Sequence, residues 1–238
     1  MNATRAFKGV LKALGLRRPL LRLFSAEYRR LERLARPIIA GIRAAGFDTV
    51  RARHANSQEG YRKYLVELEA HIELVIQEAL EVCAIESPPL RVLDLGCGPG
   101  YFLFALRSFG HDIVGLDIAE TRVFNDLVEQ LRIPRVVHRV EALKPLPELG
   151  PPFDLITALG IVFDLHRTDR IWGAREWEYF LNDCRSRLRP GGRLYLRFNP
   201  ATTREFDYIP DEVALMLQRL PGGSLAASKE HFLLQREP

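Results

Sequence analysis

From Arg91 to Phe198 the chain alternates short apolar, β-branched runs with stretches of helical periodicity. Strands are predicted at Arg91–Leu95, Asp112–Leu116, Arg135–Val140, Phe153–Ala158 and Arg193–Phe198, and helices at Tyr101–Phe109, Glu120–Gln130 and Arg175–Leu188. This alternation is typical of a doubly wound α/β sheet with parallel strands. After a predicted helix near Asp211–Leu220, two short runs at Ser224–Ala227 and His231–Leu234 indicate an antiparallel hairpin at one edge of the sheet.

The part of the chain before Ser87-Pro88-Pro89 has a helical pattern throughout. Pro19 and Pro37 interrupt this pattern, and we expect them to break or kink it. A long helix is predicted from about Ser57 to Cys83, with Ser57 as its N-cap. We therefore expect a basic helical segment at 1–86, acting as a lid or cap, and an α/β domain at 87–238.

The charge of the chain is unevenly distributed. Up to Gly46 there are eleven basic residues and two acidic ones, a surplus of nine positive charges. Because the whole chain carries +4, the remainder carries −5. A basic amphipathic segment of this kind suits an anionic partner, such as a membrane surface or the phosphates of RNA, although a solvated face is the simplest interpretation.

Composition excludes several other classes. No apolar run approaches the roughly 20 residues of a membrane-spanning helix, and basic residues interrupt every candidate signal sequence, so we expect a cytoplasmic protein. Cys83, Cys97 and Cys184 show no metal-ligand spacing, which predicts no metal site and three small, reduced, semi-buried side chains.

The most specific motif is the run from Val92 to Gly100, which reads VLDLGCGPG. A strand that enters a glycine-rich turn and then a helix presents free backbone N–H groups to a ligand at the end of a sheet. The turn reads G-x-G-x-G, Asp94 stands two residues before its first glycine, and Asp117 ends the next strand. A carboxylate at that position can accept hydrogen bonds from both hydroxyls of a ribose.

This run resembles motif I of the class I S-adenosylmethionine-dependent methyltransferases. Leu116-Asp117, Phe153-Asp154-Leu155-Ile156 and the segment from Leu188 to Leu194 resemble the later motifs of that family, in order and spacing. The resemblance implies a seven-stranded Rossmann-like sheet with an antiparallel last strand, preceded here by the N-terminal helical extension. It also implies S-adenosyl-L-methionine as the cofactor.

The resemblance further implies a set of cofactor-binding residues. The turn, with Gly96, Cys97, Gly98 and Gly100, would contact the methionine part of the cofactor, and Asp94 would hold the turn and reach the amino group. Asp117 would bind the ribose, and Ile118 would cover one face of adenine. Glu141 and Ala142 would meet the adenine edge, and Leu159 would line the methionine side.

The methyl acceptor is less well specified. His166 is the candidate general base, because its ordinary pKa lies near neutrality, and Tyr61 is a candidate for binding the cofactor carboxylate or the acceptor. The fourth strand is not followed by the Asp/Asn-Pro-Pro-Tyr/Phe motif of enzymes that methylate amino groups of nucleic-acid bases. We expect a small-molecule or lipid- or sugar-linked acceptor. An RNA methyltransferase that uses the basic N-terminus, or a non-catalytic cofactor-binding partner protein, remains the alternative; the oligomeric state stays open.

Overall fold

A seven-stranded sheet forms the centre of the molecule in a computed structural model, which describes residues 26–57, 60–82, 84–85, 87–161, 172–198 and 209–237. The strands are β1 (Arg91–Leu95), β2 (Asp112–Asp117), β3 (Arg135–Val137), β4 (Phe153–Ile161), β5 (Leu188–Phe198), β6 (Gly223–Leu225) and β7 (His231–Gln235). Their order is β3-β2-β1-β4-β5-β7-β6. The first five are parallel, and β7 runs antiparallel to both β5 and β6. The predicted doubly wound sheet with an antiparallel last strand is confirmed.

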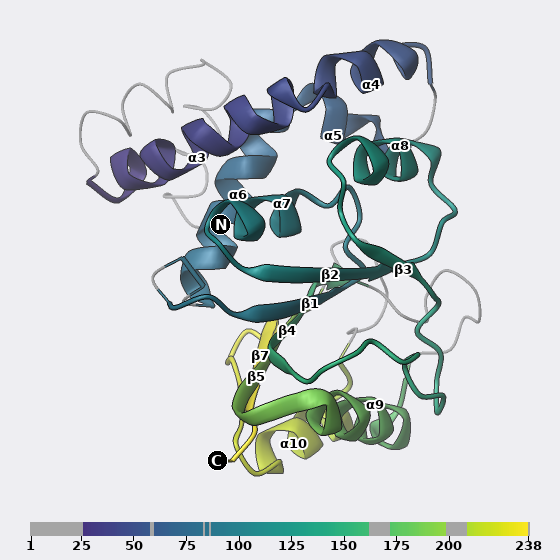
Figure 1. Cartoon of the computed structure of the whole chain (residues 1–238). Helices are drawn as coiled ribbons and strands as arrows, with labels where there is room; N and C mark the ends of the chain where they lie inside the picture. The colour runs from purple at the N-terminus through teal and green to yellow at the C-terminus, as the bar shows by residue number, and fades with distance from the viewer. Residues whose placement is uncertain are drawn as a thin grey trace, which may run out of the picture.

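Helices cover both faces of this sheet (Figure 1). One face carries α3 (Ala26–Ala44), α4 (Phe47–Arg53), η1 (Gly60–Arg62), α5 (Lys63–Val66), α6 (Leu68–Glu81), α7 (Tyr101–Ser108) and α8 (Arg122–Gln130), and the other carries α9 (Ala174–Arg187) and α10 (Asp211–Arg219). Two hydrophobic clusters correspond to these faces. Because side chains alternate along a strand, Val92 faces the first cluster and Leu93 the second. Asp94 therefore points to the same face as Val92, beneath α6.

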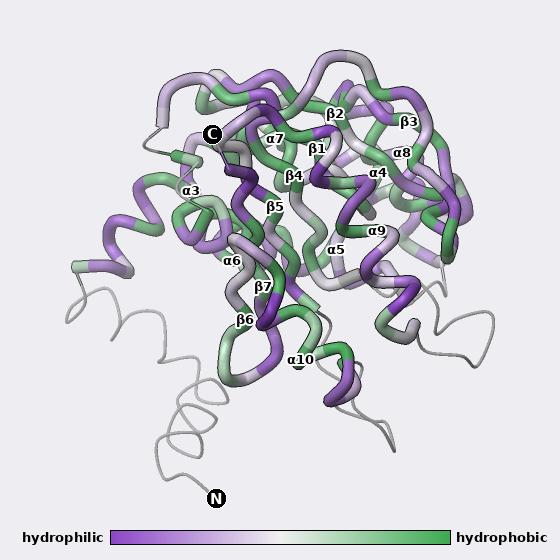
Figure 2. The backbone as a smooth tube through the Cα atoms, turned by 90° about the horizontal axis from the view of Figure 1, so that it is seen from below, coloured by the Kyte–Doolittle hydropathy of each residue, from purple (hydrophilic) through white to green (hydrophobic). Residues whose placement is uncertain are grey.

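Helix α3 packs its apolar stripe against α6 and α7. Ala35, Ile38 and Ile42 are buried, and Figure 2 shows hydrophilic and hydrophobic residues alternating along the helix. Pro37, which was expected to break or kink the helical pattern, does not break it, because it lies inside α3. Pro37 is exposed, so water can bond to the backbone carbonyl that loses its amide partner there. Pro19 lies outside the described residues.

The predicted single helix from Ser57 to Cys83 is also wrong. This stretch forms η1, α5 and α6, with a break at Glu67, whose φ of −110° and ψ of 41° are not helical. Ser57 precedes η1 and does not cap a long helix. The Tyr64 carbonyl, which a continuous helix would pair with the amide four residues later, accepts a hydrogen bond of 2.9 Å from the Tyr101 hydroxyl. That bond ties α5 to α7.

The largest differences between predicted and observed strand boundaries are in β3, β4 and β5. β3 ends three residues earlier than expected, and β4 continues to Ile161. β5 begins at Leu188, five residues before the predicted start at Arg193, and its pairing with β4 shifts register between Phe153 and Leu155. At this shift Gly192 lies close to the backbone of Arg189, since a Cβ on Gly192 would be 2.8 Å from the Arg189 carbonyl oxygen.

The structure bears on the membrane-spanning potential of the helices and on the state of the cysteines. Within the described ranges no helix is long and apolar enough to cross a membrane. Cys97 and Cys184 are buried and not disulfide-bonded, in agreement with the expected small, reduced side chains, and Cys83 lies outside the described residues.

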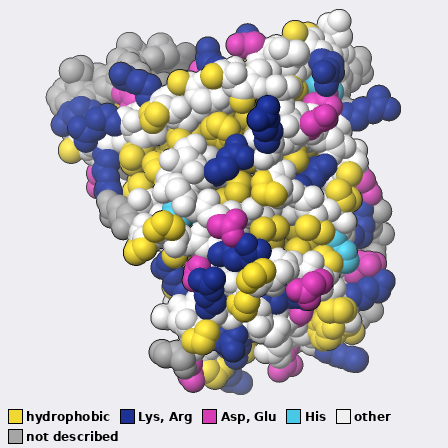
Figure 3. Space-filling model, viewed as in Figure 1, with side chains coloured by type: hydrophobic (Ala, Val, Ile, Leu, Met, Phe, Trp, Pro, Cys, Tyr) yellow, Lys and Arg dark blue, Asp and Glu magenta, His cyan; other side chains and the backbone are white. Residues whose placement is uncertain are grey.

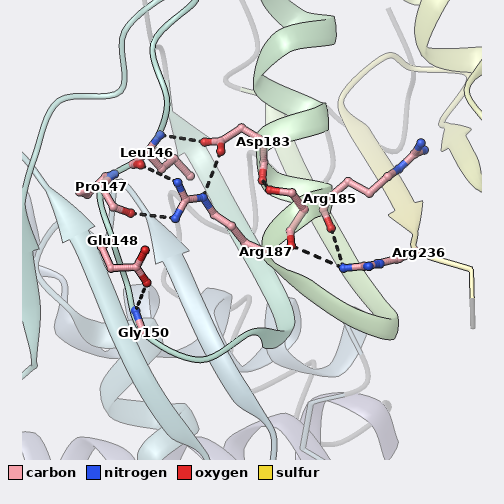
Figure 4. Close-up of polar contacts among 9 residues, drawn as sticks. Leu146, Pro147, Glu148, Gly150, Asp183, Arg185, Arg187 and Arg236 are labelled. Atoms are coloured by element: carbon pink, nitrogen blue, oxygen red, sulfur yellow. Dashed lines mark hydrogen bonds and ion pairs between the residues drawn. The ribbon is translucent and has the colours of Figure 1, made fainter.

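Arg187, at the end of α9, fastens the long segment that follows β3 (Figure 4). Its guanidinium donates to the carbonyl oxygens of Leu146 at 2.5 Å and Pro147 at 2.8 Å. Asp183, one turn earlier, pairs with Arg187 at 3.2 Å and accepts a hydrogen bond of 2.7 Å from the Leu146 amide. Since Leu146 is itself buried, these contacts hold the segment against α9.

We expect the substitution Arg187→Met to lower the free energy of unfolding by about 1–3 kcal/mol, because it leaves two half-buried carbonyls without donors. Urea unfolding followed by circular dichroism measures this difference. Arg185→Met is the matched control, since Arg185 lies on the same helix and donates to an exposed carbonyl, that of Pro221. Equal losses in both variants would contradict the role given to Arg187.

Candidate active site

The turn between β1 and α7 is built from three glycines in the left-handed region of backbone conformation. Gly96, Gly98 and Gly100 have φ values of +74°, +52° and +78°, which residues with a Cβ rarely adopt. At Gly100 a Cβ would in addition lie 2.7 Å from Cγ1 of Ile133. The Gly96 amide donates to the Leu116 carbonyl at 2.7 Å. The turn therefore requires glycine and is fastened to the end of β2.

Asp117, the last residue of β2, closes the connection from the other side. Its Oδ2 accepts a hydrogen bond of 2.6 Å from the Gly98 amide, and its Oδ1 accepts one of 2.6 Å from the Ile118 amide. Burial raises the pKa of Asp117, and the two amide hydrogen bonds oppose this shift. Each carboxylate oxygen has two lone pairs, so both can still accept a hydroxyl of a ligand. Asp117 therefore holds the turn through the Gly98 amide, a contact that was not predicted from the sequence.

Asp94 lies deeper, between β1 and β4. It is 3% exposed, and its Oδ1 accepts a hydrogen bond of 2.7 Å from the Thr157 hydroxyl. Burial raises the pKa of Asp94 to about 8, the Thr157 hydrogen bond lowers it, and the nearby carboxyl groups of Glu78 and Asp117 raise it. A carboxyl group in this setting becomes fully charged when a cation reaches it.

Aromatic side chains from the N-terminal helices and α8 form a wall next to the glycine turn. The ring of Tyr61 lies 4.7 Å from that of Phe124, and Tyr64 meets Phe124 edge-on at 5.2 Å, between ring centroids. His71 stacks on Tyr64 at 4.4 Å. Phe124 also lies close to the turn, since a Cβ on Gly98 would be 3.7 Å from its ring. The break before α6 brings Tyr61 and Tyr64 to this place.

A buried ion pair joins α6 to the end of β5. Oε1 of Glu78 lies 2.6 Å from Nη2 of Arg197, and the Glu78 side chain is 6% exposed. Burial raises the pKa of Glu78 to about 7; Arg197 lowers this pKa, and Glu81 raises it. Neither residue was predicted from the sequence to belong to the site. The one feature of the sequence that could have indicated Glu78 is its position inside the buried stripe of α6, next to Ala79.

These groups surround a cavity of about 480 Å³. Its lining comes from the glycine turn, the ends of β1, β2, β4 and β5, and the helices above them: Tyr61, Lys63, Tyr64, His71, Leu74, Val75, Glu78, Asp94, Gly96, Cys97, Gly98, Pro99, Tyr101, Phe102, Asp117, Phe124, Leu159, Gly160 and Arg197. A second cavity, of about 220 Å³, shares Leu74, Glu78 and Arg197 with the first. The Glu78–Arg197 pair thus lies where the two cavities meet.

The structure brings together most of the residues expected to form the site. Asp94, Gly96, Cys97, Gly98, Asp117, Leu159 and Tyr61 line the larger cavity. Gly100 and Ile118 do not line it, although both are adjacent to residues that do. Glu141 and Ala142 are exposed and outside its lining, and Glu141 pairs with Lys144 at 2.9 Å. His166 lies outside the described residues. In the part of the chain that the structure describes, no group of three or more His, Cys, Asp or Glu side chains could hold a metal ion.

Part of the chain is similar to known methyltransferases. Residues 93–194 match a family described as a methyltransferase domain. A tRNA U34 carboxymethyltransferase from Azotobacter vinelandii is 33% identical over 109 residues, which are 44% of this chain and 31% of that protein. A ubiquinone biosynthesis O-methyltransferase from Rhizobium rhizogenes is 29% identical over 108 residues, 45% of this chain and 40% of that one. The solved magnesium protoporphyrin IX methyltransferase of Synechocystis, with bound S-adenosylmethionine, has 16% identity and a TM-score of 0.48, covering 92% of this chain and 97% of that one.

The family match begins within β1 and includes the glycine turn, Asp94 and Asp117. It identifies residues 93–194 as a methyltransferase domain, and the strand order agrees with the class I S-adenosylmethionine-dependent fold predicted from the sequence. The class predicted from the sequence is confirmed, and S-adenosylmethionine is the cofactor of this family. The chain spans less than half the length of the two curated relatives described above.

We expect the substitution Asp94→Asn to flatten the pH dependence of stability. In the folded protein the pKa of Asp94 is about 8, above the roughly 3.9 of an unfolded aspartate, so the folded state retains a proton. Stability is therefore lost as the pH rises from about 4 through 8, and asparagine removes this loss while still accepting the Thr157 hydrogen bond. Urea unfolding at pH 5, 7 and 9 measures the effect. Asp48→Asn, at an exposed aspartate of α4, is the control. Parallel curves for wild type and Asp94→Asn would contradict the prediction.

Proposed function

We propose that the protein transfers the methyl group of S-adenosylmethionine to a small-molecule acceptor or to a lipid- or sugar-linked metabolite. The observation that carries this proposal is the cavity of about 480 Å³ at the glycine turn, into which Asp94 and Asp117 both face. Its two carboxyl groups and its backbone amides complement a ligand that carries a ribose and an ammonium group. A concave cavity of this size is typical of sites for small molecules.

The proposed placement of the cofactor follows from the groups that line the cavity. Asp117 would accept hydrogen bonds from the ribose hydroxyls through its remaining lone pairs, and the turn at Gly96 and Gly98 would contact the methionine part. Asp94 would become charged and pair with the ammonium group. Adenine would lie between Ile118 and the ring of Phe124, the aromatic residue closest to Gly98. Glu141 would have to leave Lys144 to meet the adenine edge.

The chemistry requires mainly positioning. When bound, S-adenosylmethionine supplies a methyl group on a positively charged sulfur, and the acceptor atom must reach that methyl carbon in line with the bond that breaks. Tyr61 belongs to the wall on which an acceptor could rest. His166 remains the proposed general base for an acceptor that must lose a proton, and Leu159 would line the methionine side.

The proposal can be tested first at the cofactor. We expect micromolar binding of S-adenosylmethionine in calorimetry and none of NAD. Asp117→Ala should weaken this binding by about 1.5–3 kcal/mol, the range of hydrogen bonds to charged groups. Asp112→Ala, at the exposed opposite end of β2, should leave it unchanged. Unchanged affinity in a folded Asp117→Ala variant would remove this residue from the site, and binding of NAD instead of S-adenosylmethionine would overturn the function.

The exposed face of α3 supports RNA as the alternative acceptor. Arg29, Arg30, Arg33 and Arg36 are exposed on this helix, and Figure 3 shows basic side chains gathered over it. Arginine binds phosphate groups with two parallel hydrogen bonds, and one set of relatives is named for tRNA. The same face would equally suit an anionic membrane surface or an acceptor that carries a phosphate.

Transfer of label distinguishes these acceptors. The protein is incubated with methyl-tritiated S-adenosylmethionine and, separately, with total cellular RNA, a lipid extract and metabolites below about 3 kDa. We expect label in the metabolite or lipid fraction. Label in RNA would establish the alternative acceptor, and binding of the cofactor without label in any fraction would favour a non-catalytic partner protein. Heat-denatured protein serves as the control.

A further inference from the structure

The Glu78–Arg197 ion pair lies inside the site but belongs to none of the motifs from which the site was predicted. Both residues of the pair line the larger cavity and the smaller one. Its Glu78 side chain is 6% exposed and its Arg197 side chain 27%. A buried pair of this kind contributes little net stability, so its position at a ligand cavity calls for an explanation in terms of binding.

The pair leaves hydrogen-bonding capacity unused. Apart from the ion pair, neither Oε1 of Glu78 nor Nε of Arg197 makes a hydrogen bond within the described part of the chain, although both atoms are buried. A guanidinium has five N–H donors in one plane and binds a carboxylate best through two of them at once. Buried donors without partners are costly. Arg197 is therefore able to bind a better-placed anion.

The position of Arg197 in the sheet indicates which kind of anion could bind to its guanidinium. In the register of the sheet Arg197 pairs with Leu159 of β4, and a Cβ on Gly160 would lie 3.4 Å from its Nη2. On the other side of β4 is β1, which carries Asp94. A carboxyl group that can charge and a guanidinium thus face one end of the cavity. An amino-acid zwitterion, with its ammonium and carboxylate groups, complements that arrangement.

We propose that Arg197 leaves Glu78 and pairs with the α-carboxylate of the methionine moiety when S-adenosylmethionine binds. In the free protein the Glu78 carboxylate substitutes for that ligand group. This inference rests on the function proposed above and adds a residue that distinguishes ligands with the amino-acid carboxylate from those without it. It also implies that Glu78 competes with the ligand for the same guanidinium.

The test is the ratio of two affinities measured by calorimetry. S-adenosylmethionine and decarboxylated S-adenosylmethionine differ only in the carboxylate, so their affinity ratio isolates its contribution. In the wild type we expect a ratio of roughly 10 to 100, the range of a hydrogen bond to a charged group. Arg197→Met should reduce the ratio to about three or less. Glu78→Gln should raise it, because the competing carboxylate is gone.

Two further variants serve as controls for the effect of Arg197→Met. Arg193→Met removes an arginine from the same strand, one that donates to the Val82 carbonyl at 3.1 Å and lines neither cavity, and it should keep the wild-type ratio. If Arg197→Met alone does not fold, the double variant Arg197→Met/Glu78→Gln removes both buried charges and should also show a ratio near one.

The outcomes separate this inference from the function on which it rests. A wild-type ratio that survives in Arg197→Met, or a ratio that falls in Glu78→Gln, would overturn the exchange while leaving cofactor binding intact. Failure of the wild type to bind either ligand would instead overturn the proposed function.

Discussion

The hydrogen bond between the Gly98 amide and Asp117 joins the two strand ends on which the site depends. β1 and β2 pair in parallel up to Leu95 and Leu116, and beyond that point the chain must turn into α7 without losing the contact. The turn achieves this through left-handed glycines, whose conformation directs amides towards β2. Asp117 thereby fixes the turn and keeps free lone pairs for a ligand. Structural support and ligand recognition are combined in one carboxyl group.

A second constraint is the concentration of buried carboxyl groups around the same cavity. Burial raises the pKa values of Asp94, Glu78 and Asp117, and Arg197 is paired with one of them. Such groups are costly to the fold when charged and unpaired. A ligand with a sulfonium and an ammonium group offsets this cost by bringing positive charge. The site is thus better matched to its cationic ligand than to solvent, as electrostatic preorganisation requires.

The sequence predicted those features that follow from local chemistry. The glycines at Gly96, Gly98 and Gly100 indicate a turn whose backbone needs positive φ. The alternating apolar runs predict the strands, and the length of the second run shows that Asp117 stands at the end of its strand. Glu78 could not be assigned in this way, because its partner Arg197 lies more than a hundred residues away and only the sheet register brings them together. The break at Glu67 was missed for a related reason. At this break the Tyr64 carbonyl accepts a hydrogen bond from the Tyr101 hydroxyl, a contact that the periodicity of α5 and α6 does not reveal.

The helical segment before the sheet has two chemically different faces, an apolar inner one and a basic outer one. Its inner residues complete the site, since Tyr61 and Glu78 line the cavity, and Ile38 of α3 belongs to the same hydrophobic cluster as Ile76 of α6. Its outer face carries the exposed arginines. Deleting α3 would expose the cluster beneath it and disturb α6, so a loss of activity would not distinguish recruitment of an anionic acceptor from support of the cavity. Substituting the exposed arginines alone leaves the inner face intact, because charge acts over about 8 Å at physiological salt while packing acts only in contact.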